Sequence, residues 1–130
     1  MASHAEVCRK CKQAQWEAVH QPLDVSQERV AWIAGILEGE GTWSETRQAW
    51  YVKVSMTDLD IIERLQEWTG VGRITEWRSP AAYHKTVYTW RVDAKIHREW
   101  LTLLVWPWLG ERRKKRIRQL WPDASVVLMV

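Results

Sequence analysis

The sequence contains no phenylalanine and no asparagine, which we attribute to coding-base bias rather than to mechanism, and it has only two cysteines. Two cysteines imply no disulfide framework. The longest strongly apolar stretch, residues 100–109, is interrupted by Pro107 and is shorter than the roughly 18 residues of a membrane span. The first twenty residues mix charged and polar side chains without an apolar core, so they do not resemble a secretory signal. We therefore expect a protein of the cytoplasm, or of the interior of an organelle or a phage-infected host, with no membrane partner.

The chain has 130 residues, of which 46% are hydrophobic and 27% are charged. This composition predicts one folded domain with its own core rather than a disordered chain. The length excludes a multidomain polymerase, helicase or synthetase. The charge is unevenly placed: residues 111–118 carry six basic side chains and one acidic one, whereas the net charge of the whole chain is +3. This concentration of positive charge points to a polyanionic partner.

Residues 1–22 are polar and lack apolar periodicity, so we predict an appendage there, a globular domain over 23–121 and a short tail over 122–130. The appendage holds Cys8 and Cys11, with His4 and His20 as further potential zinc ligands. The set lacks the second paired spacing of zinc fingers and ribbons. We therefore favour a disordered lead-in or the remnant of a larger zinc module over a functional zinc site.

Hydrophobic periodicity predicts the element order α-β-β-α-β-β-α-α. Side chains at helix starts are expected to act as caps: Asp24, Ser26 or Gln27 for the first helix, Thr57 for the second and Asp93 for the third. The expected elements are a helix from about 24 to 39, a hairpin over 42–55 turning near 47–49, a helix over 57–70, strands over 72–78 and 86–92, a helix ending before Pro107, and a basic helix reaching 121. Because βαβ alternation is absent, we expect an α+β fold, with a four-stranded antiparallel sheet, helices on one face and the other face open to a partner.

The first predicted helix carries glycines that cost roughly 1 kcal/mol each relative to alanine. Ala31, Gly35 and Gly39 are four residues apart, so they form a stripe with almost no side chain that allows another helix to approach closely. The stripe ends at Glu38 and Glu40, where a helix C-terminus disfavours anions, which points to a cation site. A glycine cap followed by two solvated glutamates is an equally good interpretation of the spacing alone.

Residues 33–41, IAGILEGEG, resemble the LAGLIDADG signature of the homing endonucleases. The resemblance extends over about 25–120 and fits the α-β-β-α-β-β-α order. It includes Thr42 after the last glycine, Met56-Thr57-Asp58 at a helix entry, Gly70-Val71-Gly72 at a strand entry, and Pro107-Trp108-Leu109 followed by basic residues. With a single copy of the motif, the resemblance implies a homodimer whose motif helices pack across a two-fold axis. The interface residues would be Ala31, Ala34, Gly35, Glu38 and Gly39.

The resemblance also implies catalytic roles. Glu40 would ligate a divalent metal at the dimer centre, with the carbonyl of Gly39 as a further ligand, and Glu38 could instead cap or stabilise the motif helix. Such oxygen ligands suit Mg²⁺, for which Mn²⁺ could substitute. Arg112, with Arg113 as second candidate, would stabilise the charge on the scissile phosphate. The implied reaction is hydrolysis of both strands of DNA by an endonuclease from a mobile genetic element.

Sequence recognition would use the open sheet face, since a two-stranded ribbon fits the major groove of DNA. Periodicity places the following side chains there: Thr42, Ser44, Thr46, Tyr51, Lys53, Arg73, Thr75, Trp77, Thr89 and Arg91. In the basic helix, Lys114 and Lys115 are further candidates for DNA contacts, although that helix could also be a solvated face.

Two features speak for a protein of another class. Glu40 stands where the family more commonly has aspartate, and Met56 aligns with a polar residue that orders water, a task that would fall to Ser55 or Lys53. The alternative function is a DNA-binding protein that does not cleave, or an RNA splicing helper, on the same fold.

Overall fold

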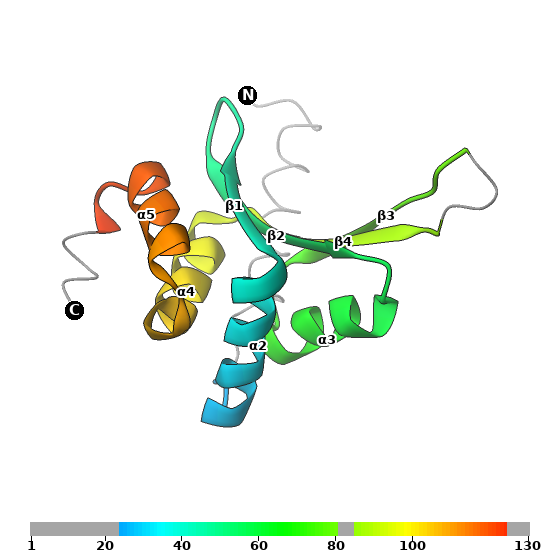
Figure 1. Ribbon diagram of the computed structural model, residues 1–130, viewed down its shortest axis with the longest axis horizontal. Helices are drawn as coiled ribbons and strands as arrows, with labels where there is room; N and C mark the ends of the chain where they lie inside the picture. Colours follow the sequence, from blue (N-terminus) through cyan, green and yellow to red (C-terminus); the bar gives the residue numbers. More distant parts are fainter. Residues whose placement is uncertain (1–23, 81–84, 125–130) are drawn as a thin grey trace, which may run out of the picture.

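The computed structural model describes residues 24–80 and 85–124, so the predicted appendage, its cysteine pair Cys8 and Cys11 and the end of the tail lie outside the described residues. The element order matches the predicted one (Figure 1). The elements are α2 (Gln27–Glu40), β1 (Gly41–Glu45), β2 (Trp50–Met56), α3 (Leu59–Thr69), β3 (Arg73–Trp77), β4 (Val87–Val92), α4 (Lys95–Val105), the 3₁₀ turn η1 (Trp106–Trp108) and α5 (Glu111–Leu120).

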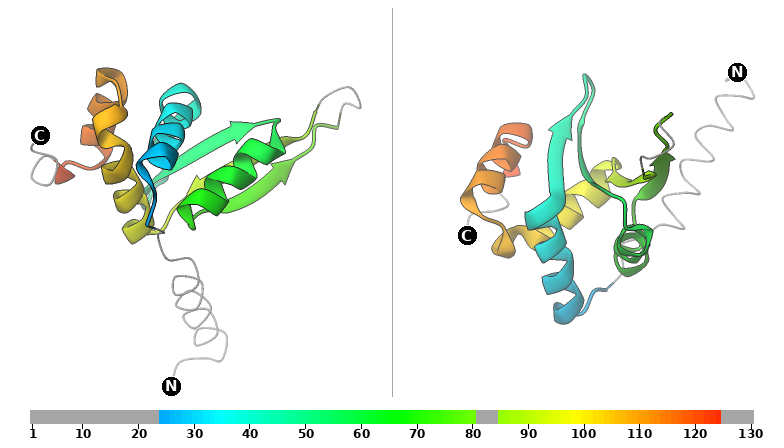
Figure 2. Two further views of the ribbon diagram at one scale, coloured as in Figure 1. Left: turned by 90° about the horizontal axis from the view of Figure 1, so that it is seen from below. Right: turned by 45° about the vertical axis from the view of Figure 1, so that its right-hand side comes forward.

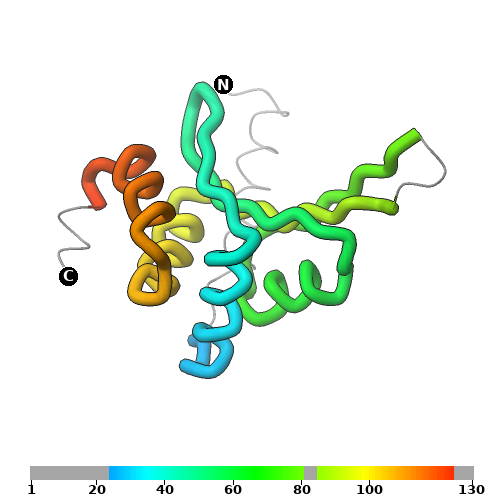
Figure 3. Tube along the Cα trace, viewed as in Figure 1, coloured from blue at the N-terminus to red at the C-terminus, as the bar shows by residue number. Residues whose placement is uncertain are grey.

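The strands form one antiparallel sheet in the order β1-β2-β4-β3, which confirms the predicted fold class. The two hairpins point their tips in different directions, so the sheet is strongly twisted (Figure 1). Helices α2 and α3 lie on the same side of it (Figure 2). Helix α5 lies beside β1, although the two are far apart in the sequence (Figure 3).

Alternation along the strands creates the two faces of the sheet. In β2, Trp50, Val52 and Val54 are buried while the residues between them are partly exposed, and in β4 the buried side chains are Trp90 and Val92. The buried Trp90 indole N–H on this side has a partner, since it donates to the Val71 carbonyl over 2.9 Å. The core therefore fills one face and leaves the other uncovered, as the alternation predicts.

The ends of α2 follow from its flanking residues. Of the three predicted caps, Ser26 is the one used: its hydroxyl accepts from the Arg29 N–H over 3.4 Å. Of the two glycines expected to stop the helix, Gly39 lies within it, and the chain leaves the helix at Gly41. A Cβ at Gly41 would lie 2.5 Å from the Leu37 carbonyl oxygen, so only glycine fits this sharp exit into β1.

Two predicted caps are wrong. Asp58, not Thr57, precedes α3, and its side chain makes no cap hydrogen bond. Ala94 precedes α4. Asp93 does not cap that helix because its carboxylate is held by two arginines of the sheet, Arg91 and Arg73. Ion pairs with Arg91 at the end of β4 and with Arg73 of β3 thus hold the carboxylate away from the start of the following helix.

Candidate functional site

The C-terminal end of α2 brings an unpartnered acid to the surface. Glu40 is the last residue of the helix, is exposed, and makes no hydrogen bond or ion pair with the residues that the structure describes. Gly39 is also exposed, and its carbonyl belongs to the last turn, where carbonyl groups lack partners within the helix. Within residues 24–80 and 85–124, no three His, Cys, Asp or Glu side chains gather closely enough to hold a metal ion. The described part of one protomer therefore offers Glu40 and the Gly39 carbonyl as oxygen donors, without further acidic, histidine or cysteine side chains gathered around them.

The small-residue stripe is on the outside of the protomer, except for one member. Gly35 and Gly39 are exposed, and a Cβ built on either would meet no atom within 4 Å. Ala31 is half-buried. Ala34, which the sequence placed in the interface, is fully buried beside Ile33 in the core of its own chain. Ala34 therefore packs within the protomer, and the accessible stripe is Ala31, Gly35 and Gly39.

Glu38 ties α2 to α5. Its carboxylate accepts from the Gly110 N–H, which begins α5, over 3.1 Å, and lies 3.5 Å from the Arg113 guanidinium. An acid at a helix N-terminus satisfies an unpaired backbone donor and complements the helix dipole. Of the two roles expected for Glu38, the structure places its carboxylate in the stabilising one.

Arg113 is used inside the chain. Its side chain is only 13% exposed. Nε donates to the carbonyl of Glu38 over 2.7 Å, and Nη1 donates to the carbonyl of Gly41. These contacts hold the end of α2 and the start of β1 against α5. Arg113 thus serves as a clamp for backbone carbonyl groups, which leaves it poorly placed to meet a phosphate.

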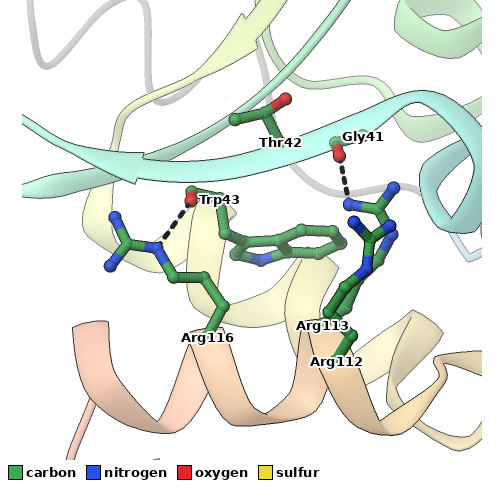
Figure 4. A pocket seen from close by; sticks show the side chains of 6 residues that line it. All are labelled: Gly41, Thr42, Trp43, Arg112, Arg113 and Arg116. Atoms are coloured by element: carbon green, nitrogen blue, oxygen red, sulfur yellow. Dashed lines mark hydrogen bonds between the residues drawn. The ribbon is translucent and has the colours of Figure 1, made fainter.

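Arg112 is free where Arg113 is not. It is exposed and has no hydrogen bond or ion pair with any described residue. Together with Arg116, it lines a hollow of about 180 Å³ between α5 and the first residues of β1 (Figure 4). Gly41, which follows Glu40 directly, lines the same hollow. The free guanidinium of Arg112 therefore lies in a hollow whose wall begins one residue after the free carboxylate of Glu40.

Arg116 was not singled out from the sequence. Its Nε donates to the carbonyl of Trp43 over 3.3 Å, so it lines the hollow from the next turn of α5. The four-residue spacing between Arg112 and Arg116 is the signal that would have found it.

The basic helix is divided between two faces. The Lys114 ammonium nitrogen lies 5.2 Å from the centre of the Trp106 ring, and the Arg118 guanidinium carbon lies 5.5 Å from it. These two side chains therefore point toward η1 rather than toward the hollow. Lys115 is exposed. Lys114 is therefore held against an aromatic ring, whereas Lys115 is open to solvent.

The open sheet face collects the side chains that periodicity assigned to it. One row across the sheet consists of Thr42, Lys53, Arg91 and Arg73, and the next contains Ser55, Thr89 and Thr75. The Ser55 and Thr89 hydroxyls lie 2.7 Å apart. Trp77, at the far end of β3, is 61% exposed. This face is therefore polar and basic, with one large exposed aromatic side chain near its edge.

Thr46 belongs to the β1–β2 turn rather than to the face. Its hydroxyl donates to the carbonyl of Ala49 and accepts from the N–H groups of Gln48 and Ala49. A side chain that holds its own turn in this way is not free to read a base. Thr46 therefore serves the turn, and the remaining predicted readers lie on the strands.

One arginine with a perturbed pKa lies away from this face. Burial lowers the pKa of the Arg98 guanidinium from its ordinary value, partly offset by Glu99 and Asp93. Arg98 also lies over the Trp50 ring at 4.8 Å and donates to the carbonyl of Asp93. Arg98 holds α4 against the sheet and forms no part of the candidate site.

Comparison with known proteins bears on the fold. No protein-family model and no curated protein matches the sequence. Among solved structures, the archaeal intron-encoded homing endonuclease I-Vdi141I, complexed with DNA, superposes with a TM-score of 0.51 at 20% identity over 62% of this chain and 55% of its own. The homing endonuclease I-CvuI, in complex with the I-CreI target in the presence of magnesium with the DNA not cleaved, gives 0.52 at 17% identity over 72% of this chain and 64% of its own.

These similarities show that the chain has the fold of the homing endonucleases. They confirm, at the level of fold, the resemblance indicated by residues 33–41. The matched region spans less than two thirds of either enzyme. No helix of the described part of the chain is long and apolar enough to cross a membrane.

Proposed function

We propose that this protein is a site-specific DNA endonuclease of the homing type, which hydrolyses both strands as a homodimer with a divalent metal, and which a mobile genetic element encodes. One observation carries the proposal: the end of α2 presents Glu40 without a partner, next to a hollow that holds the unpaired Arg112. A carboxylate without a partner in the protomer is available to a metal ion, and a guanidinium without a partner is available to a phosphate.

The homodimer rests on the exposed stripe of α2. Glycine within a helix lowers its stability by about 1 kcal/mol relative to alanine. The protomer derives no packing benefit from Gly35 or Gly39, because the space beyond each is open. A second α2 crossing this stripe would gain close backbone approach from both glycines. In a two-fold dimer the same surface serves both copies, so it would also bring two Glu40 side chains together.

The metal fits the donors present. The carboxylate of Glu40 and the carbonyl of Gly39 are hard oxygen ligands, which suit Mg²⁺ and Mn²⁺. Zinc is more often bound by imidazole and thiolate ligands. Completion of the site by a second copy fits the small number of ligands that one protomer provides. A bound divalent metal supplies a nucleophilic water and stabilises the leaving oxygen.

The remaining groups act on the phosphodiester. Arg112 stabilises the charge that develops on the scissile phosphate, since the planar fork of an arginine suits phosphate oxygens. Met56, at the end of β2, offers no hydrogen bond to water. Ser55 is exposed but already paired with Thr89, which leaves Lys53 as the better donor to order water on this face.

Double-stranded DNA is the substrate proposed for the open sheet face. The two similar enzymes are described in complex with DNA, one of them in the presence of magnesium. The face presents a row of basic side chains on adjacent strands, and backbone phosphates provide most of the affinity of such surfaces.

The proposal is tested by cleavage of DNA that spans the uninterrupted insertion site of the gene. The wild type should give discrete double-strand cuts in Mg²⁺ and in Mn²⁺, and none in EDTA. Glu40→Gln should abolish cleavage while leaving DNA binding and the unfolding midpoint unchanged, because Glu40 makes no contact within the described chain. Glu63→Gln, an exposed glutamate on α3, is the matched control and should cleave like the wild type.

The outcomes separate the proposal from its alternative. Cleavage that persists in Glu40→Gln would remove Glu40 from the metal site. The other result is a wild-type dimer that binds the target DNA specifically without cutting it in any divalent metal. That result would assign the protein to the DNA-binding proteins that do not cleave.

A further inference from the structure

The open face contains one arginine whose orientation is fixed from two sides. The guanidinium carbon of Arg91 lies 3.6 Å from the centre of the Tyr51 ring. Its Nε donates to Oδ1 of Asp93 over 2.8 Å. The other arginine near this carboxylate, Arg73, is more loosely held, at 3.6 Å with 64% of its side chain exposed. Stacking fixes the plane of Arg91, and the Nε bond fixes its rotation within that plane.

These contacts leave the outer edge of the guanidinium unused. Arginine has five N–H donors, and in Arg91 only the N–H on Nε donates a hydrogen bond to a described residue. Its terminal nitrogens donate to no residue that the structure describes. The side chain lines a surface hollow of about 530 Å³, whose other walls are Asp93 and the turn between β1 and β2. The free fork therefore has room in front of it for an acceptor from outside the chain.

The carboxylate of Asp93 determines which kind of hydrogen-bond acceptor the Arg91 guanidinium favours. Asp93 lies against Arg91 and offsets much of the positive charge that attracts a phosphate. It leaves the geometry of the planar fork intact. A neutralised but oriented fork favours an uncharged pair of acceptors over an anion. In the major groove of DNA, guanine alone offers two adjacent acceptors, O6 and N7, which arginine binds bidentately.

We infer that Arg91, oriented by Tyr51 and Asp93, reads one guanine in each half of the DNA site. The inference rests on the proposed function, because it needs a duplex on the open sheet face. Because both constraints on Arg91 exist before DNA arrives, less conformational entropy is lost on binding. Arg73, without stacking, contacts the backbone and contributes to affinity rather than to sequence preference.

The experiment uses duplexes with a randomised central region, selected by retention on the full-length protein and sequenced. The wild type should enrich guanine at one position in each half-site. Competition binding with that base pair changed should show a preference of about 5- to 150-fold, which corresponds to one bidentate contact. Arg91→Lys keeps the charge and loses the fork, so it should lose this preference at that position alone. Arg73→Lys is the matched control and should keep it.

Asp93→Ala gives the decisive result because the carboxylate has two roles with opposite effects on binding. Alanine removes both the negative charge and the oxygen that accepts from the Arg91 Nε–H, an acceptor that asparagine would keep. Loss of the charge should strengthen binding to random-sequence DNA, yet the guanine preference should fall, since Arg91 is no longer oriented. Asp60→Ala, on α3, controls for the change in net charge. The preference is a ratio measured on one protein sample, so a smaller folded fraction leaves it unaltered.

Three outcomes overturn the inference. Arg91→Lys with an unchanged guanine preference removes Arg91 as the reader. Asp93→Ala with stronger binding and an unchanged preference leaves Asp93 as a compensating charge between two arginines. If the wild type selects no duplex, the proposed function fails first, and the reading role of Arg91 fails with it.

Discussion

Substitution of Gly35 separates the stability of the protomer from that of the dimer. A Cβ at this position meets no atom within 4 Å, so a side chain fits the protomer without strain. Gly35→Ala and Gly35→Leu should each raise the unfolding free energy of the isolated protomer by about 1 kcal/mol, the difference in helix propensity. In the proposed dimer, a leucine on the contact stripe overpacks the interface by about 1–3 kcal/mol for each copy. With two copies per dimer, the dissociation constant should rise at least about thirtyfold.

Sedimentation across a wide range of protein concentration measures the association, and urea unfolding at low concentration measures the protomer. Glu63→Leu, which adds an exposed leucine to α3, controls for the added apolar surface and should dimerise like the wild type. A Gly35→Leu protein that associates as tightly as the wild type would refute the assignment of this stripe to the interface. A destabilised Gly35→Ala protomer would show that the stripe is already covered within one chain.

Three further substitutions compare two positions that the protomer packs tightly with one that it leaves free. Gly72→Ala should lower the unfolding free energy by about 2–5 kcal/mol in urea titrations, because Gly72 has φ +88° and its Cβ would lie 2.2 Å from the Trp90 indole nitrogen; a loss below about 1 kcal/mol would contradict this packing. Arg112→Ala should leave stability within about 0.5 kcal/mol of the wild type and abolish cleavage, whereas Arg113→Ala should cost about 2 kcal/mol by unpairing the carbonyl groups that it holds. Equal effects of the two substitutions on stability would show that Arg113 is no clamp.

Much of the fold follows from local patterns. Alternation in β2 and β4 predicted which side chains are buried, because each strand has one face on the core. The end of α3 at Gly70, in the left-handed conformation with φ 72°, follows from the glycine itself. The caps at Thr57 and Asp93 could not be predicted in this way. Asp93 could cap its own helix or pair with Arg91, two residues before it, and local sequence does not decide between these contacts. Strand pairing then brings Arg73 of β3 to the same carboxylate.

The site shows the same division between local and long-range causes. Helical spacing predicted an exposed stripe that includes Gly35 and Gly39, and both lie on it. The same spacing does not decide on which side Ala34 lies, since an alanine suits the core and a helix contact equally well. It was the packing of α2 against its own chain that buried Ala34.

The two neighbouring arginines of α5 show why composition alone does not identify a catalytic residue. Their positions differ by one residue, which rotates their side chains by about 100° around the helix. Arg113 turns toward the end of α2, where carbonyl groups that the helix leaves unpaired attract its guanidinium. Arg112 turns into the hollow, where nothing in the described chain neutralises it. The protomer thus uses one arginine to fix the end of the helix that carries Glu40 and leaves the other without a partner in the described chain; in the proposed function that partner is the scissile phosphate. Exchanging the two roles would require turning α5 about its axis, which its buried Ile117 prevents.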